Sequence, residues 1–488
     1  MKPTKDLFEL IKSLSVSEKR YFKMFASLQE GNKIYIRLFN EIDKQDSYDE
    51  KKIKEKFKDE KFIKQLSFTK NYLYKLIFKS LLNYNHEVSI DSKISEMILR
   101  CKILFSKALY RQYFKTLKSV TELADKYERY GYLIQILEMG KLVKKKDELK
   151  NSPYDEYYSA AMETLEKIKN NFEYSKLLAY TFNIARDKGK IRNPVQLEEL
   201  EEILNLEHSQ TGKKIITKRA EETYFHLKSL ISEVSGDYES KLENLKQRYN
   251  IVLENPEPFE DNILNYKADI LSEMITVCIK LQKFEETECY LKKFEDIQKP
   301  DSNDEAAVFV PAFSRLLISI SKKDFKNVTG TINLLEKALI DYKDKIDISF
   351  ELEVHFNIIK AYMLSGDFNN ALIKMNYFFS HPLLHVRSDL ECFARIMNLI
   401  IHYELNNIAL LEHLIVSTYR YLYKRNKIFK IESLLLNFLR KTTLITNESE
   451  LTEHLAILRN SLLKLKQDNF EKNAFEYFDF ALWIEDKG

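Results

Sequence analysis

The stretch AYMLSGDFNNAL, residues 361–372, contains the features that decide the fold. Gly366 and Asp367 separate two apolar runs, each with the periodicity of an amphipathic helix. Glycine adopts positive φ at a helix end without steric cost, so this pair predicts a sharp turn between two helices. Phe368 can then pack back on the first helix, and Ala371 is small enough to let the two helices approach closely. The stretch therefore predicts a helical hairpin.

Similar phrases recur along the chain at a nearly constant interval. An aromatic residue follows a small or polar pair in SGDYESKL (235–242), LQKFEETE (281–288), SKKDFKNV (321–328) and SGDFNNAL (365–372). These four aromatic positions are separated by 46, 41 and 43 residues, and weaker copies place Tyr110 and Ile408 in the same role. A period of this length is typical of helical repeats in which each hairpin stacks on the next.

The prolines support the same period independently. Proline cannot continue a helix, so prolines at a regular interval mark the places where one hairpin ends and the next begins. Two pairs are 41 and 44 residues apart and a third pair is 82 apart, which is two such steps: Pro153 with Pro194, Pro256 with Pro300, and Pro300 with Pro382. Two unrelated residue types therefore predict an all-α helical-hairpin solenoid with repeats of about 40–46 residues.

The composition favours long helices joined by short loops. The 488 residues include only 9 glycines and 8 prolines, which β-turns and strand hairpins require in larger numbers. The four cysteines have neither metal-binding nor disulfide-framework spacing, so we expect free thiols in a reducing compartment. No apolar run is long enough to span a membrane. We therefore expect a cytoplasmic protein without a membrane partner.

Three regions are expected along the chain. Residues 1–88 form a small N-terminal helical domain with a basic helix, residues 89–466 form the helical-hairpin solenoid, and residues 467–488 form a C-terminal capping helix. The last region contains the only tryptophan, Trp483, among several aromatic residues. These aromatics either dock a partner or belong to a terminal helix that covers the last open hairpin, and the second interpretation is favoured because solenoids need such caps.

The pattern A-Y-x(3)-G-D-F-x(2)-A-L at 361–372 resembles the tetratricopeptide repeat, and Pro382 lies close to the position of that repeat's terminal proline. SGDYESKL (235–242) resembles it to a lesser degree, and these units are longer than the family's repeat of about 34 residues. The resemblance covers roughly 95–466 and implies a right-handed solenoid of lengthened hairpins. It also implies that the first helices of the hairpins line a concave groove that binds protein segments.

This resemblance identifies candidate groove positions by counting back from each turn. They are Asp269 and Glu273 before Phe284, and Glu353, Asn357 and Lys360 before Gly366. The family's peptide clamp uses lysine and asparagine to hold a terminal carboxylate, which Asn357 and Lys360 partly match. Asp269 and Glu273 carry the opposite charge. We therefore expect a protein or peptide partner of basic or mixed charge.

A second candidate surface lies on the helix predicted over 62–85. At 100° per residue its apolar residues share one face, while the opposite face carries lysines and aromatics: Lys64, Phe68, Tyr72, Lys75 and Lys79. Residues 51–82 contain ten lysines and three acidic residues, a net charge of +7 (10 − 3). Lysines neutralise phosphates and aromatic rings stack on bases, so this face fits nucleic acid. The alternative is a helix packed on both sides, with its aromatics buried and its lysines extended to solvent.

Known catalytic motifs are absent from the sequence. It contains no GxSxG, HExxH, GxGxxG or phosphate-binding glycine loop. His381 and His385 are one helical turn apart, but Pro382 interrupts the helix between them, and a zinc site needs further ligands, for which His402 is the nearest candidate. We therefore expect no metal, no cofactor and no enzyme activity. An active site without a recognised motif stays open as a third interpretation.

The leading interpretation is a non-enzymatic scaffold or adaptor that binds segments of protein partners in the solenoid groove. The alternative is a regulator whose basic N-terminal domain binds nucleic acid while its solenoid senses a partner. The formal net charge of the whole chain is only +3, so no global field attracts nucleic acid or membranes. That balance favours the scaffold.

Overall fold

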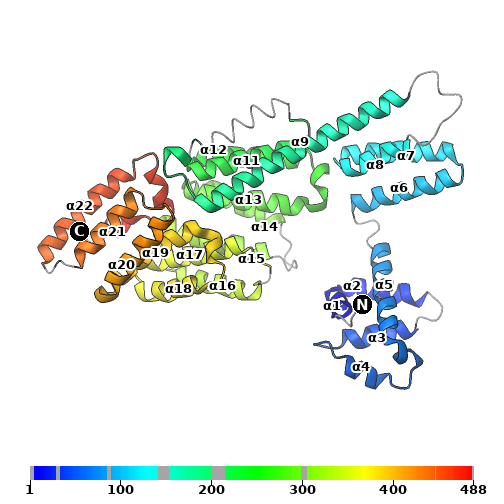
Figure 1. Ribbon diagram of the computed structural model, residues 1–488, viewed down its shortest axis with the longest axis horizontal. Helices are drawn as coiled ribbons and strands as arrows, with labels where there is room; N and C mark the ends of the chain where they lie inside the picture. Colours follow the sequence, from blue (N-terminus) through cyan, green and yellow to red (C-terminus); the bar gives the residue numbers. More distant parts are fainter. Residues whose placement is uncertain are drawn as a thin grey trace. The chain divides into compact units, whose positions relative to one another are not determined.

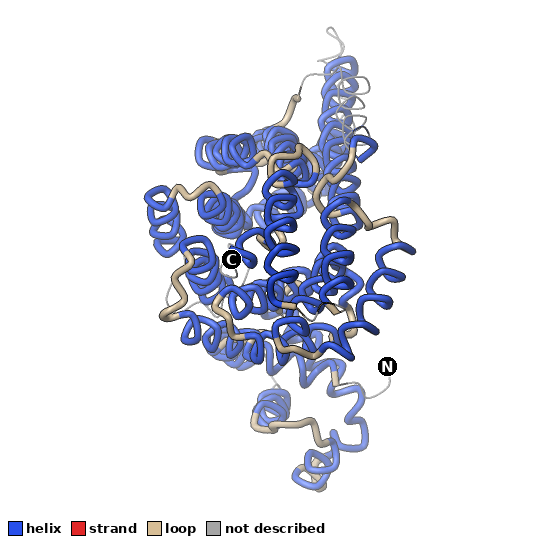
Figure 2. The backbone as a smooth tube through the Cα atoms, turned by 90° about the vertical axis from the view of Figure 1, so that its left-hand side faces the viewer, coloured by secondary structure: helices blue, strands red, loops and turns tan. Residues whose placement is uncertain are grey.

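The computed structural model describes residues 5–28, 33–84, 89–140, 153–196, 198, 215–297, 305–343, 345–443, 445 and 447–485. Every regular element in these ranges is a helix, and no strand occurs among them (Figure 2). The predicted all-α class is therefore confirmed. The chain divides into two compact units, Met1–Ala161 and Met162–Gly488, which are called unit 1 and unit 2 below.

Unit 1 contains a cluster of short helices followed by longer ones. Its described elements are α1 (Asp6–Ser13), α2 (Val16–Ser27), α3 (Lys33–Asp43), α4 (Glu50–Lys56), the 3-10 turn η1 (Lys61–Gln65), α5 (Leu66–Tyr84), α6 (Ile90–Ser106), α7 (Tyr110–Lys126) and α8 (Tyr130–Gly140). The apolar residues of α1–α5 form one core, in which the rings of Phe22 and Phe39 lie 4.6 Å apart. The helix predicted over 62–85 is divided into η1 and α5, so Lys64 lies in a 3-10 turn.

Unit 2 contains most of the hairpins. Its described elements are α9 (Pro153–Lys188, whose first turns belong to unit 1), α11 (Lys218–Ser235), α12 (Tyr238–Glu254), η2 (Glu257–Asn262), α13 (Ile263–Lys280), α14 (Phe284–Ile297), α15 (Glu305–Lys322), α16 (Val328–Asp341), α17 (Ile348–Leu364), α18 (Phe368–Ser380), η3 (Leu384–Arg387), α19 (Ser388–Glu404), α20 (Ile408–Lys424), α21 (Lys430–Thr442), α22 (Glu448–Leu465), η4 (Glu471–Glu476) and α23 (Phe480–Glu485).

Among the described residues, eight turns between helices share one backbone arrangement. In each of them one residue has the left-handed conformation: Ala108, Glu128, Gly236, Gln282, Lys323, Gly366, Asn406 and Asn426. The next residue donates its N–H to the carbonyl five positions back, as Asp367 does to Tyr362 O at 2.9 Å. This is the Schellman arrangement, which satisfies carbonyls at a helix end. An apolar or aromatic residue always follows two positions after the left-handed residue, which explains the recurring phrase in the sequence.

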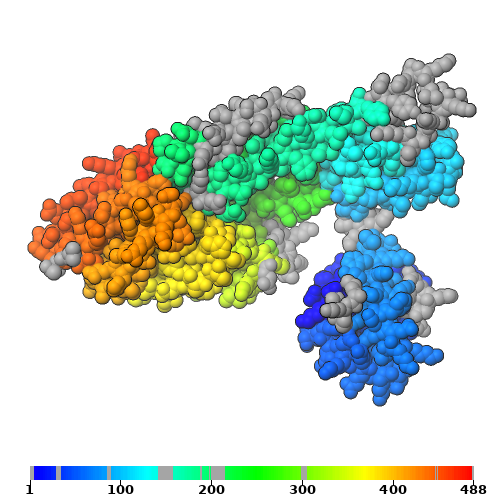
Figure 3. Space-filling view, in the orientation of Figure 1, coloured from blue at the N-terminus to red at the C-terminus, as the bar shows by residue number. Residues whose placement is uncertain are grey.

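The hairpins of unit 2 pack in sequence order (Figure 1). The paired helices are α11 with α12, α13 with α14, α15 with α16, α17 with α18, α19 with α20, and α21 with α22. From α13 onward, the first helix of each hairpin also packs against the first helix of the next hairpin, in the order α13, α15, α17, α19 and α21. Buried apolar side chains of neighbouring hairpins of unit 2 form shared clusters. The space-filling view shows these hairpins, coloured green to red, lying against one another (Figure 3). The first helices therefore form a continuous row.

The prolines follow the predicted boundaries in part. Pro256 and Pro382 lie between helices, and Pro153 is the first residue of α9. Pro311 lies inside α15 instead of at a boundary. Pro300, on which two of the predicted intervals depend, lies outside the described residues.

Candidate segment-binding surface

Residues 470–485, called the C-terminal segment here, make polar and aromatic contacts with several helices of unit 2. It contains η4 and α23 and adds apolar side chains to the core of the last hairpins. Trp483 is buried, donates its indole N–H to Glu404 at 2.6 Å, and meets the rings of Tyr403 and Phe438 edge-on. This segment therefore packs against α19 and α21, and Trp483 is engaged within the chain.

The same segment reaches further along the row of first helices. The Tyr477 ring stacks on Phe393 of α19, with ring centroids 4.1 Å apart. Lys360 of α17 donates to the backbone carbonyl of Glu476 at 3.3 Å. Lys280, the last residue of α13, lies 3.7 Å from the Glu476 carboxylate. Ion pairs, a backbone contact and ring stacking thus hold one polypeptide segment against α13, α17 and α19.

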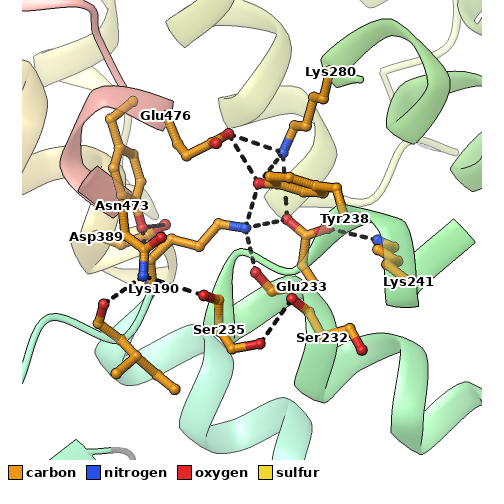
Figure 4. A network of polar contacts seen from close by, with 12 residues as sticks. Lys190, Ser232, Glu233, Ser235, Tyr238, Lys241, Lys280, Asp389, Asn473 and Glu476 are labelled. Carbon is orange, nitrogen blue, oxygen red and sulfur yellow. Dashed lines mark hydrogen bonds and ion pairs between the residues drawn. The ribbon is translucent and has the colours of Figure 1, made fainter. Parts of the chain in front are cut away.

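Around Glu476 lies a compact set of charged side chains, called the lysine–glutamate network here (Figure 4). It consists of Lys190, Glu233, Tyr238, Lys241, Lys280 and Glu476. The Tyr238 hydroxyl accepts from Lys190 at 2.7 Å and from Lys280 at 2.8 Å, and donates to Glu476 at 2.9 Å. The Glu233 carboxylate accepts from Lys190 at 2.6 Å and from Lys241 at 2.7 Å. The network joins the end of α9, the α11–α12 turn, α13 and the C-terminal segment.

Burial sets the electrostatics of this network. Burial lowers the pKa of Lys190 to about 8, although the neighbouring Glu233 carboxylate favours its charged form. Burial alone would raise the pKa of Glu233, but Lys190, Lys280 and Lys241 hold that pKa well below its ordinary value. Burial also raises the pKa of Tyr238, and the two glutamates beside it raise this pKa further. The network is therefore a set of fixed charges around a neutral phenol at neutral pH.

The arrangement fits a structural role better than catalysis. A general base or nucleophile needs a face that is open toward a substrate. Here the Tyr238 hydroxyl has two donors and one acceptor, and the Lys190 ammonium contacts Glu233 and Tyr238. Fully satisfied polar networks of this kind fix the relative positions of the elements that they join.

The predicted groove residues lie around this network. On α13, Asp269 is exposed, while Glu273 lies 3.3 Å from Lys241 and 3.1 Å from Arg248. Burial would raise the pKa of Glu273, but Lys241 and Arg248 lower it overall. Helical spacing places Asp269 and Glu273 on the same side of α13 as Lys280.

On α17 the predicted residues also share one side. Glu353, Asn357 and Lys360 follow one another at helical spacing. The Glu353 carboxylate lies 3.6 Å from Arg387, with 41% of its side chain exposed, and the Asn357 amide donates to the Glu353 carbonyl at 2.9 Å. Burial lowers the pKa of Lys360 to about 8. Sequence reasoning missed Lys190, Glu233 and Glu476, because no local pattern links the three regions from which they come.

A second buried cluster fixes the start of the C-terminal segment. Arg192 forms ion pairs with Glu432 at 3.0 Å and with Glu471 at 2.7 Å, and about 5% of each of these side chains is exposed. Glu471 also accepts the backbone N–H groups of Lys430 and Ile431, the first residues of α21. The Arg192 guanidinium lies over the Phe429 ring. One cation is therefore paired with two carboxylates in a buried site.

The predicted basic face of unit 1 is exposed. Phe68 is 68% exposed and Tyr72 is 39% exposed, and Lys64, Lys75 and Lys79 are also exposed. The opposite face of α5 packs into the core with Leu66, Leu73, Leu76 and Ile77. The sequence did not single out Lys70, which is buried on that side and donates to Glu50 at 2.5 Å and to Tyr48 at 3.0 Å.

The Glu50–Lys70 pair predicts an acid-sensitive contribution to the stability of unit 1. Hydrogen bonds from Lys54 and Lys70 lower the pKa of Glu50 from 4.5 to about 2. The unfolded chain therefore takes up this proton first as the pH falls, so the contribution is complete above pH 4.5 and is lost toward pH 2. Because Glu50 is partly exposed, we expect Glu50→Gln to cost only about 1 kcal/mol at neutral pH.

The measurement is urea unfolding followed by circular dichroism, at neutral pH and near pH 3. The matched control is Glu55→Gln, which changes an exposed carboxylate of the same helix. The Glu50 variant should be less stable than the Glu55 variant at neutral pH, and this difference should shrink in acid. Equal stability of the two variants at neutral pH would contradict the assignment.

The described part of the chain contains no group of three or more histidine, cysteine, aspartate or glutamate side chains that could hold a metal. His381, which the sequence paired with His385, instead lies 3.7 Å from Glu351. No described helix is both long enough and apolar enough to cross a membrane.

No family model, curated protein or solved structure matches this chain. The likeness of residues 361–372 to the tetratricopeptide repeat therefore rests on the residue pattern and on the hairpin turn. The structure shows an all-α chain of packed helical hairpins among the described residues. This is a less specific description than a tetratricopeptide-like solenoid.

Proposed function

We propose that the protein is a non-enzymatic interaction scaffold whose unit 2 binds segments of partner proteins along its row of first helices. In this proposal the hairpins form a tetratricopeptide-like solenoid with lengthened helices. The protein has three buried cysteines and one exposed cysteine, all of them free thiols, which suits a reducing compartment such as the cytoplasm.

One observation carries the proposal: the row of first helices already holds a polypeptide segment. Lys280 and Lys360 contact Glu476, and Phe393 stacks on Tyr477. Charged groups, a backbone carbonyl and a ring are recognised by three different helices. These are the kinds of contact by which proteins bind peptide segments.

The N-terminal halves of α13 and α17 offer a further part of the same surface. The C-terminal segment contacts Lys280 and Lys360, near the C-terminal ends of these helices. Asp269 and Glu353 lie two to three turns earlier on the same sides, and both reach solvent. Their charges are negative, so this surface suits a partner segment of basic or mixed charge.

The test combines site-specific cross-linking with charge reversal. A photoreactive phenylalanine derivative is placed at position 357 on the first helix α17, or at position 340 on the second helix α16, in the full-length chain expressed in its native cells. We expect discrete cross-linked proteins from position 357 that are missing from position 340. Asp269→Lys with Glu353→Lys should remove these products.

The matched control reverses two charges on the second helix of the same region. Glu288 and Glu295 of α14 are exposed, and Glu288→Lys with Glu295→Lys should leave the cross-linked products unchanged. If both charge-reversed chains keep the products, or if positions 357 and 340 give the same products, the first helices are not the binding surface.

A further inference from the structure

One side of α5 packs against the core of unit 1, and the other side is exposed. On the core side, the ammonium group of Lys70 forms an ion pair with Glu50. On the other side, no ion pair or hydrogen bond with the described residues involves the side chains of Lys64, Lys75 or Lys79. Exposed lysines without ion-pair partners are explained by solubility alone. The aromatic residues between these lysines need a separate explanation.

Those aromatic rings are exposed at positions between the lysines. Phe68 is 68% exposed and Phe78 is 41% exposed. The Tyr72 ring lies against Tyr35 of α3, with centroids 4.5 Å apart and planes inclined by 30°. The Tyr35 ring therefore holds the Tyr72 ring in place, and the two rings are called the Tyr72–Tyr35 platform below. From Phe68 to Lys79 the stripe extends over twelve residues, and the two ends lie about 16 Å apart along the helix. The interpretation of a helix packed on both sides does not describe α5, because these rings are not buried.

The combination has a specific chemical match. Lysines without carboxylate partners can neutralise phosphates, and each contact releases a counterion. Exposed rings can stack on bases, but only on bases that are not already stacked in a duplex. The face contains both groups, and residues 51–82 of unit 1 have a net charge of +7. An acidic protein segment would use the lysines but would leave the rings unexplained.

We propose that the exposed face of η1 and α5, with Lys64, Phe68, Tyr72, Lys75 and Lys79, binds single-stranded nucleic acid. Phosphates lie against the three lysines, and unstacked bases lie on Phe68 and on the Tyr72–Tyr35 platform. This activity is separate from the segment binding of unit 2. The protein would then bring a nucleic acid strand and a partner protein together.

The test uses the full-length chain and a fluorescein-labelled, mixed-sequence single strand of about 15 nucleotides, a length within the range of single-strand sites. Binding is followed by fluorescence anisotropy at several salt concentrations. Replacing Lys64, Lys75 and Lys79 by glutamine should weaken binding at least about tenfold and reduce the slope of log K against log salt by about 2, because three phosphate contacts are lost. Phe68→Ala with Tyr72→Ala should weaken binding by about 10- to 100-fold while leaving the slope unchanged.

The control removes the same charge elsewhere in unit 1. Lys102, Lys107 and Lys115 are exposed on and near α6 and α7, and their triple replacement by glutamine should leave the salt slope within about 0.5 of the wild-type value. Since all substituted residues are exposed, every variant should keep the wild-type circular dichroism spectrum, which is checked first. If a variant does not keep it, the single substitutions Lys75→Gln and Phe68→Ala replace the combined ones.

Several results would overturn the proposal. One is the absence of binding by the wild-type chain, and another is an equal effect of the two lysine triples. Tighter binding to the matching duplex than to the single strand would remove the stacking role of the rings. Binding to phosphatidylserine vesicles that survives a saturating amount of the single strand would assign the face to a membrane surface instead.

Discussion

Arg192→Met is expected to lower the free energy of unfolding of unit 2 by about 3–5 kcal/mol, because two buried carboxylates lose their common cation. Glu432 and Glu471 are each about 4% exposed and cannot regain water while the chain stays folded. The measurement is urea unfolding followed by tryptophan fluorescence. Trp483 is the only tryptophan and is buried in unit 2, so its emission reports on that unit alone.

Two further variants separate charge from geometry. Arg192→Lys keeps the charge but cannot pair with both oxygens of Glu432, so it should still lose about 1–3 kcal/mol. Arg186→Met changes an exposed arginine near the end of α9 and should shift stability by less than about 0.5 kcal/mol. If Arg192→Met is no more harmful than Arg186→Met, the buried cluster does not fasten the C-terminal segment.

Gly236→Ala is expected to destabilise unit 2 by about 3 kcal/mol, whereas Gly366→Ala should cost only about 1 kcal/mol. Both glycines have φ of 78° in the same kind of turn, so the backbone strain of an alanine is the same at both. At Gly366 an added Cβ meets nothing within 4 Å. At Gly236 it would overlap the amide oxygen of Asn473 in the C-terminal segment.

The extra cost at Gly236 comes from the bonds that Asn473 would lose. Its amide donates to the Ile191 carbonyl at 2.7 Å, and its side chain is buried. The double variant Gly236→Ala with Asn473→Ala should therefore be more stable than the sum of the two single effects predicts, by about 1 kcal/mol or more. Equal losses for Gly236→Ala and Gly366→Ala would show that Asn473 does not lie against this turn.

The hairpins could be predicted because their turns are local. The left-handed residue, the hydrogen bond five positions back and the following aromatic all lie within a few residues of one another. Gly236 and Gly366 give a clear signal in the sequence. The turns at Gln282 and Lys323 were predicted without a glycine, from the aromatic residue that follows each of them. The turns at Glu128 and Asn426 were missed, although Tyr130 and Ile428 follow them in the same position.

The networks of unit 2 could not be predicted, because their members are far apart in the sequence. Lys190, Tyr238 and Glu476 meet only after three separate regions have folded together. Counting back from a turn identified Lys360 and Glu353 as sharing one side of α17, since helical spacing is local. It could not show that the C-terminal segment contacts Lys360, because that contact depends on the packing of the whole unit.

The proposed segment-binding role of the first helices rests on the contact of the C-terminal segment with α13 and α17. Zero-length carbodiimide cross-linking of the full-length chain, followed by mass spectrometry, tests it directly. We predict a bond between Lys280 and Glu476, whose charged groups lie 3.7 Å apart, together with one between Lys430 and Asp468, which lie 2.7 Å apart and serve as the internal control. If the control bond forms and Glu476 is joined to no lysine of α13 or α17, the C-terminal segment does not occupy this surface, and the proposed role of the first helices is contradicted.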